Sequence, residues 1–88
     1  MTKVKICGIK NLQDAIIAAD YGADAIGFVF AKSIRKVSKE KARAIVRKLP
    51  PFVTTVGLFV DDTAEEIEAA YRFCGLDAVQ LHGNEPPN

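Results

Sequence analysis

The segments Tyr21-Gly22-Ala23-Asp24-Ala25-Ile26 and Cys74-Gly75-Leu76-Asp77-Ala78-Val79 repeat one pattern. Each reads as the end of a helix, a glycine, an apolar residue, an aspartate and the start of a strand. Glycine commonly follows the last helical residue because it adopts the left-handed backbone conformation without a Cβ clash. A joint that occurs twice indicates one supersecondary unit copied along the chain.

The segments around these joints alternate between strand and helix periodicity. We expect the order β-α-β-α-β-α-β, with strands at 4–7, 25–30, 54–60 and 78–81 and helices at 11–21, 39–48 and 63–73. Strands and helices that alternate with short connections imply a parallel α/β sheet with right-handed crossovers.

Polar residues stand where the three helices should begin. Asn11 and Ser38 suit N-caps, and Thr63 with Glu66 fits a capping box. The residues expected to face inward are Leu12, Ala15, Ile16 and Ala19 in the first helix, Ala42, Ile45, Val46 and Leu49 in the second, and Ile67, Ala70 and Tyr71 in the third.

Length and charge exclude several classes of protein. The chain has 88 residues, enough for one domain, and a net charge of +1 gives no electrostatic case for binding nucleic acid or an anionic membrane. No signal peptide or membrane-spanning run is evident, so a cytoplasmic location is expected. There, Cys7 and Cys74 should be free thiols. With a single histidine and no metal-ligand spacing, we expect no metal site.

Reactive side chains stand at the carboxyl ends of the first and last strands. Side chains alternate between the two faces of a strand, so Lys5 and Cys7 share one face, and Gln80 and His82 share one face. A thiol and an imidazole at two strand ends indicate a site rather than packing.

Five segments together resemble phosphoribosylanthranilate isomerase, a single (β/α)8 barrel of the tryptophan pathway. The resemblance rests on Val4-Lys5-Ile6-Cys7-Gly8-Ile9, Gly22-Ala23-Asp24-Ala25-Ile26-Gly27-Phe28-Val29-Phe30, Ser33-Ile34-Arg35, Val56-Gly57-Leu58-Phe59-Val60 and Gln80-Leu81-His82-Gly83. It implies that residues 1–88 form one N-terminal part of a TIM-type barrel, truncated after the fourth strand.

The resemblance also implies a reaction and roles for particular residues. The family converts an aminoaldose, N-(5-phosphoribosyl)anthranilate, into an aminoketose by an Amadori rearrangement that needs no cofactor or metal. Cys7 matches the family's general base, and Arg35 matches the arginine that holds the anthranilate end. His82 lines the substrate pocket, with Gln80 one layer deeper, and Lys5 is expected in the same interior layers. The general acid and phosphate site belong to later strands, so this chain alone should be inactive.

Four strands of a barrel leave two free edges and an uncovered inner face. We expect two copies to associate, a separate C-terminal segment to complete the barrel, or the sheet to flatten into an open layer. Two other functions stay open: a non-catalytic half-barrel that assembles as a structural module, and a receiver-type signalling domain. The latter class needs an acidic cluster after the first strand, where this chain has Cys7-Gly8-Ile9-Lys10.

Overall fold

Residues 3–30 and 36–81 are described in a computed structural model of the chain. The elements alternate as expected, and their bounds differ from the predicted ones by no more than a single residue. They are β1 (Lys5–Cys7), α1 (Leu12–Asp20), β2 (Ala25–Val29), α2 (Lys39–Lys48), β3 (Thr54–Phe59), α3 (Ala64–Cys74) and β4 (Ala78–Leu81).

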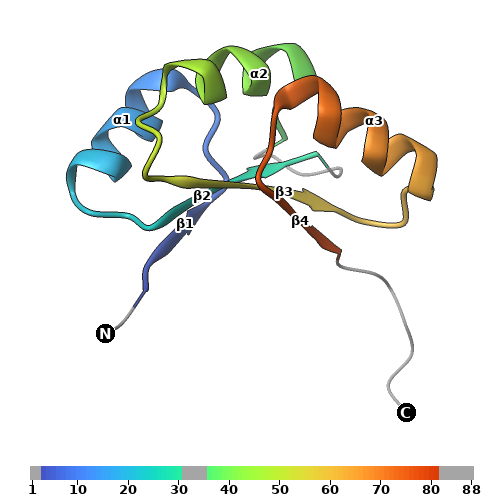
Figure 1. Ribbon diagram of the computed structural model, residues 1–88, viewed down its shortest axis with the longest axis horizontal. Coiled ribbons are helices and arrows are strands. Elements are labelled where there is room, and N and C mark those ends of the chain that lie inside the picture. Colours follow the sequence, from blue (N-terminus) through green and yellow to red (C-terminus); the bar gives the residue numbers. More distant parts are fainter. Residues whose placement is uncertain (1–2, 31–35, 82–88) are drawn as a thin grey trace.

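The four strands form one parallel sheet in the order β1-β2-β3-β4, and the three helices lie on the same face of it (Figure 1). Right-handed crossovers that always advance in one direction place every helix on one side of the sheet, which is the arrangement of a rolled barrel. A doubly wound sheet reverses direction and carries helices on both faces. The receiver-type alternative is therefore wrong, and the partial-barrel prediction fits.

The core lies between the sheet and the helices. Ile26 and Phe28 of β2 are fully buried and pack with residues of α1 and α2. Phe30 stacks on Phe59 with ring centroids 5.2 Å apart. The buried cluster consists of Ile9, Ala15, Ile26, Phe28, Val37, Ala42, Ile45, Cys74 and Leu76.

Two residues predicted to face inward do not. Ile16 in α1 is 40% exposed and Tyr71 in α3 is 39% exposed. In α1 the apolar residues run almost continuously, so the periodicity does not fix which side of the helix faces the sheet, and Ala15 and Ala18 pack inward. In α3 the inward side is formed by Ala70 and Cys74.

The predicted helix caps are confirmed. The Asn11 side chain accepts a hydrogen bond from the Asp14 N–H at 2.8 Å, and the Ser38 hydroxyl accepts one from the Lys41 N–H at 3.1 Å. Thr63 and Glu66 form a complete capping box, because each side chain accepts a hydrogen bond from the other residue's backbone N–H. Each helix start is therefore encoded locally.

The repeated joint is the same structure twice. Gly22 and Gly75 have φ values of 93° and 73°, in the left-handed region where a Cβ is unfavourable. After each glycine, an aspartate carboxylate accepts a hydrogen bond from a backbone N–H at the start of the preceding strand segment: Asp24 from Val4, just before β1, at 2.7 Å, and Asp77 from Thr55 of β3 at 2.8 Å. Each joint thus fixes the start of a new strand against its neighbour.

Replacing the second of these aspartates should cost more stability than replacing the first. In Asp77→Ala the N–H and hydroxyl of Thr55 lose their acceptor. Thr55 is only 3% exposed, and an unsatisfied buried donor costs about 1–3 kcal/mol. Asp24→Ala leaves a donor on the half-exposed Val4, which water can satisfy. Urea unfolding followed by circular dichroism measures both losses, and a loss for Asp24→Ala that equals or exceeds the other contradicts this account of the joint.

Candidate active site

Cys7 is the last residue of β1, and its side chain is exposed on the face of the sheet that carries no helix. The chain turns immediately after it, at Gly8, whose φ is 87°. The N–H groups of Gly8 and Ile9 both donate to the Gly27 carbonyl of β2, at 3.0 and 3.2 Å. The thiol therefore stands on a strand end whose backbone is held by the neighbouring strand.

Lys5 lies one step earlier on the same face and donates a hydrogen bond from Nζ to Gln80 Oε1 of β4. The two residues belong to the two edge strands, with β2 and β3 between them. The predicted common face of Lys5 and Cys7 is supported, and Gln80 joins it through this bond. Three of the five predicted site residues thus line one surface.

The register shows what this hydrogen bond requires. Cys7 pairs with Gly27, Gly27 with Val56 and Val56 with Ala78, so Gln80 stands two residues beyond this row and Lys5 two residues before it. In a flat sheet the two Cα atoms would be about 19 Å apart, from strand spacings of ~4.8 Å and a rise of ~3.3 Å per residue. Extended lysine and glutamine side chains, with the hydrogen bond that joins them, span only about 14 Å.

The sheet must therefore curve and stagger as a barrel does. In an eight-stranded barrel with a shear of 8, the level of the strands shifts by about one residue from each strand to the next. Three steps from β1 to β4 bring Gln80 to roughly the height of Lys5, and curvature brings the strands toward each other. The expectation of a flattened open layer is wrong for this structure.

Arg35 and His82 lie outside the described residues, so their predicted places stay predictions. Within 3–30 and 36–81, no group of three histidine, cysteine, aspartate or glutamate side chains is arranged to hold a metal ion. The same part of the chain contains no helix with the length and apolar character needed to cross a membrane.

The second cysteine has a different environment. Cys74 is 2% exposed, its Sγ lies 3.4 Å from the Lys39 carbonyl oxygen, and burial raises the pKa of its thiol. Cys74 therefore packs between the end of α3 and the start of α2.

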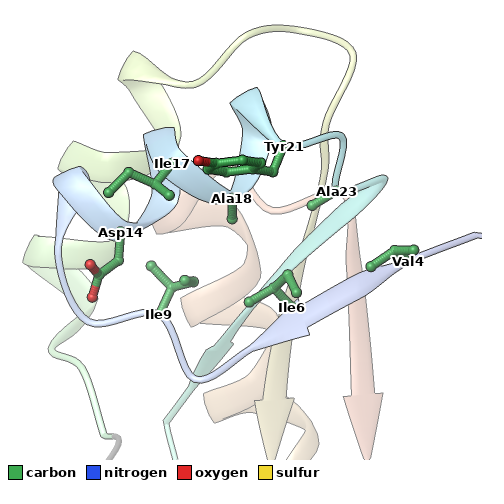
Figure 2. A pocket seen from close by; sticks show the side chains of 8 residues that line it. All are labelled: Val4, Ile6, Ile9, Asp14, Ile17, Ala18, Tyr21 and Ala23. Atoms are coloured by element: carbon green, nitrogen blue, oxygen red, sulfur yellow. The ribbon is translucent and has the colours of Figure 1, made fainter.

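An apolar groove lies at the other side of β1, away from the thiol. Figure 2 shows side chains of β1 and α1 lining it, and its volume is about 530 Å³. Asp14 is the one charged residue among its lining side chains, which are Val4, Ile6, Ile9, Asp14, Ile17, Ala18, Tyr21 and Ala23. Cys7, Lys5 and Gln80 do not line it, so this groove is separate from the surface that carries the thiol.

Comparison with known proteins shows the family of the chain. The family model of N-(5'-phosphoribosyl)anthranilate isomerase matches residues 4–88. The chain belongs to this family. A relative from Pelobacter propionicus, named N-(5'-phosphoribosyl)anthranilate isomerase, is 57% identical over 88 residues, which cover 99% of this chain and 42% of the relative.

Two solved isomerase structures superpose closely on the described fold. One is a complex with reduced 1-(o-carboxyphenylamino)-1-deoxyribulose 5-phosphate, with a TM-score of 0.93 and 54% identity, covering 98% of this chain and 45% of that one. The other shows monomers generated from the dimeric enzyme of Thermotoga maritima, with a TM-score of 0.91 and 50% identity, covering 98% and 44%. The chain thus spans less than half the length of the proteins it matches.

The sequence did not reveal Gly27 as part of this site. An isolated glycine inside a strand signals a close approach of another group, and that signal was present. The pairing of Lys5 with Gln80 was also not foreseen, because it depends on the stagger of the sheet and not on either strand alone.

The two thiols should differ strongly in reactivity. Iodoacetamide at neutral pH should alkylate Cys7 in the folded chain, while Cys74 reacts only after unfolding, because the reactive thiolate is disfavoured by burial. Since the pKa of Cys74 is raised on folding, its contribution to stability is complete below the pKa of the unfolded thiol and is lost as the pH rises toward the folded value. Mass spectrometry of peptides after timed alkylation measures the alkylation rates of Cys7 and Cys74, and equal rates contradict the assigned burial.

Proposed function

We propose that this chain forms the base-bearing part of a phosphoribosylanthranilate isomerase. The observation that carries the proposal is the exposed Cys7 thiol at the carboxyl end of β1, on the concave inner face of a partial barrel. Active sites of such barrels lie at the carboxyl ends of the strands. The substrate would be N-(5'-phosphoribosyl)anthranilate, and the enzyme an intramolecular aldose–ketose isomerase.

The chemistry needs one acid and one base. The acid protonates the furanose ring oxygen while the anthranilate nitrogen lone pair forms a C=N bond to C1, which breaks the C1–O bond. The base then removes the proton from C2, and the electrons of the broken C2–H bond form C1=C2. The π electrons of the C=N bond return to the nitrogen, which becomes neutral. Protonation at C1 and loss of the enol proton give the ketone at C2. We assign the removal of the C2 proton to Cys7.

The other predicted residues would surround this reaction. Lys5 and Gln80, bonded to each other one step below Cys7, would form the floor of the pocket. The guanidinium of Arg35 suits the anthranilate carboxylate, and His82 follows Gln80 at the end of β4. Because a reduced thiol is required, we place the working protein in the cytoplasm.

The general acid and the phosphate site would come from the remaining strands of the barrel. The chain spans 42% of the Pelobacter relative. Both edges of its sheet carry exposed apolar side chains on the helix-bearing side: Val4 just before β1, Ile6 on β1, and Val79 and Leu81 on β4. These surfaces suit the helices and strands of further βα units.

The second candidate function is a non-catalytic half-barrel that assembles with itself. The same exposed edges favour it, since two copies could cover each other's edges as further βα units would. Restored catalysis separates the two candidates, because a structural module gains no activity from a complementing half.

Mixing this chain with the complementary C-terminal segment of a close relative should restore isomerisation. Neither part alone should turn over substrate, because the base and the acid are on different parts. Fluorescence of the anthranilate group follows the reaction. Cys7→Ala should reduce kcat of the mixture by at least about a hundredfold, the lower range for loss of general base catalysis. A mixture that folds and stays inactive, or a Cys7→Ala mixture that keeps full activity, contradicts the proposal.

The isolated chain should also self-associate through its edges. At tens of micromolar, an order-of-magnitude test concentration, sedimentation should show species larger than a monomer. Leu81→Lys places a charge on the β4 edge and should shift the distribution toward monomer. Ile16→Lys, at another exposed apolar position, on α1, should leave it unchanged. A monomeric wild-type chain, or equal effects of both variants, contradicts association through the edges.

A further inference from the structure

Gly27 lies in the middle of β2 beside Cys7, on the same inner face of the sheet. A Cβ added at this position would stand 2.9 Å from Cys7 Sγ, closer than real Cβ contacts are. The distances to Cys7 Cα and Cβ, 3.4 and 3.5 Å, are ordinary. The sulfur atom alone therefore occupies the space that a side chain at position 27 would need.

The backbone of Gly27 does not explain why a glycine stands there. Within the described residues, the glycines with positive φ are Gly8, Gly22 and Gly75. Gly27 has ordinary strand conformation, which any residue adopts. Glycine in a strand interior weakens the strand, so the glycine at position 27 needs a steric explanation.

We propose that Gly27 is the positioning residue for the Cys7 thiol. A cysteine side chain has three staggered χ1 rotamers, and the one present here lays Sγ over β2, toward the interior of the concave face. On its other side β1 is a free edge of the sheet. The absent side chain at Gly27 thus holds open the rotamer that points the thiol inward, while the Gly27 carbonyl fixes the turn after Cys7.

The consequence for catalysis rests on the proposed role of Cys7 as the base. Proton transfer requires the base within hydrogen-bond reach of the proton it removes, and a misplacement of about 1 Å can cost roughly a hundredfold in rate. Turning χ1 of Cys7 by one staggered step moves Sγ by more than this. A methyl group at position 27 should therefore reduce kcat through the thiol and affect substrate binding less.

The same substitution on the opposite face provides a matched control. A Cβ at Gly57 of β3 would meet Leu76 Cδ1 at 2.7 Å, Phe59 Cε2 at 3.0 Å and Phe30 Cε2 at 3.1 Å, all in the packed layer under the helices. Gly57→Ala should destabilise the fold by overpacking and leave the Cys7 rotamer unchanged. Gly27→Ala should change the Cys7 rotamer and destabilise the fold less, because its clash involves one short side chain that can turn.

The experiment measures the Cys7 χ1 angle in the 88-residue chain by NMR three-bond couplings, together with the urea midpoint, for wild type, Gly27→Ala and Gly57→Ala. We expect a new χ1 rotamer in Gly27→Ala with a smaller loss of midpoint than in Gly57→Ala. Adding Cys7→Ala to Gly27→Ala removes the clashing sulfur and should abolish whatever midpoint loss Gly27→Ala itself causes. An unchanged χ1, or a loss that Cys7→Ala does not relieve, overturns the proposal.

A second arm uses the mixture with the complementary segment. Gly27→Ala should lower kcat at least about tenfold with a smaller change in KM, the pattern of a lost transition-state interaction. If χ1 turns and kcat is unchanged in an active mixture, the positioning role in catalysis is wrong. If the wild-type mixture is inactive, the proposed function fails, while the χ1 measurement still decides how Gly27 places the thiol.

Discussion

The rest of the structure depends on the stagger and roll of the parallel sheet. The hydrogen bond from Lys5 to Gln80, across four strands, requires both. Each right-handed crossover advances by one strand, so the helices gather on the convex side and leave the concave side open. The concave side is where Cys7 ends β1. Without the roll, the side chains of β1 and β4 would be too far apart to belong to one site.

The two sides of the sheet have different chemistry for the same reason. The convex side is a packed core in which Gly57 is surrounded by Leu76, Phe59 and Phe30. The concave side carries the exposed Lys5, Cys7 and Gln80, and there the Cys7 sulfur occupies the space that a Cβ at Gly27 would need. A methyl group therefore has opposite expected effects at the two glycines, through fold stability at one and through placement of a reactive atom at the other.

Local features of the sequence predicted much of this structure. The repeated joint, the caps at Asn11, Ser38 and Thr63, and the common face of Lys5 and Cys7 all follow from short-range patterns. The inward side of α1 did not, because its apolar residues are nearly continuous and Ile16 could not be distinguished from Ala18.

Contacts between side chains of different strands could not be predicted from the sequence. The approach of Cys7 to Gly27 depends on the register between β1 and β2, and the approach of Lys5 to Gln80 depends on three strand pairings together. A resemblance to a family could name Cys7, Arg35 and His82 as site residues. It could not show that an absent side chain on the neighbouring strand decides where the thiol points.

The roll of the sheet in this chain is tested most directly by NOEs between the side chains of Lys5 and Gln80. We predict cross-peaks from the Lys5 ε-methylene protons to the Gln80 side-chain amide protons, alongside those between the paired strands, such as Leu58 with Gln80. If the contacts between neighbouring strands are present and the contact between Lys5 and Gln80 is absent, the sheet is flat. That result would contradict the account of the site.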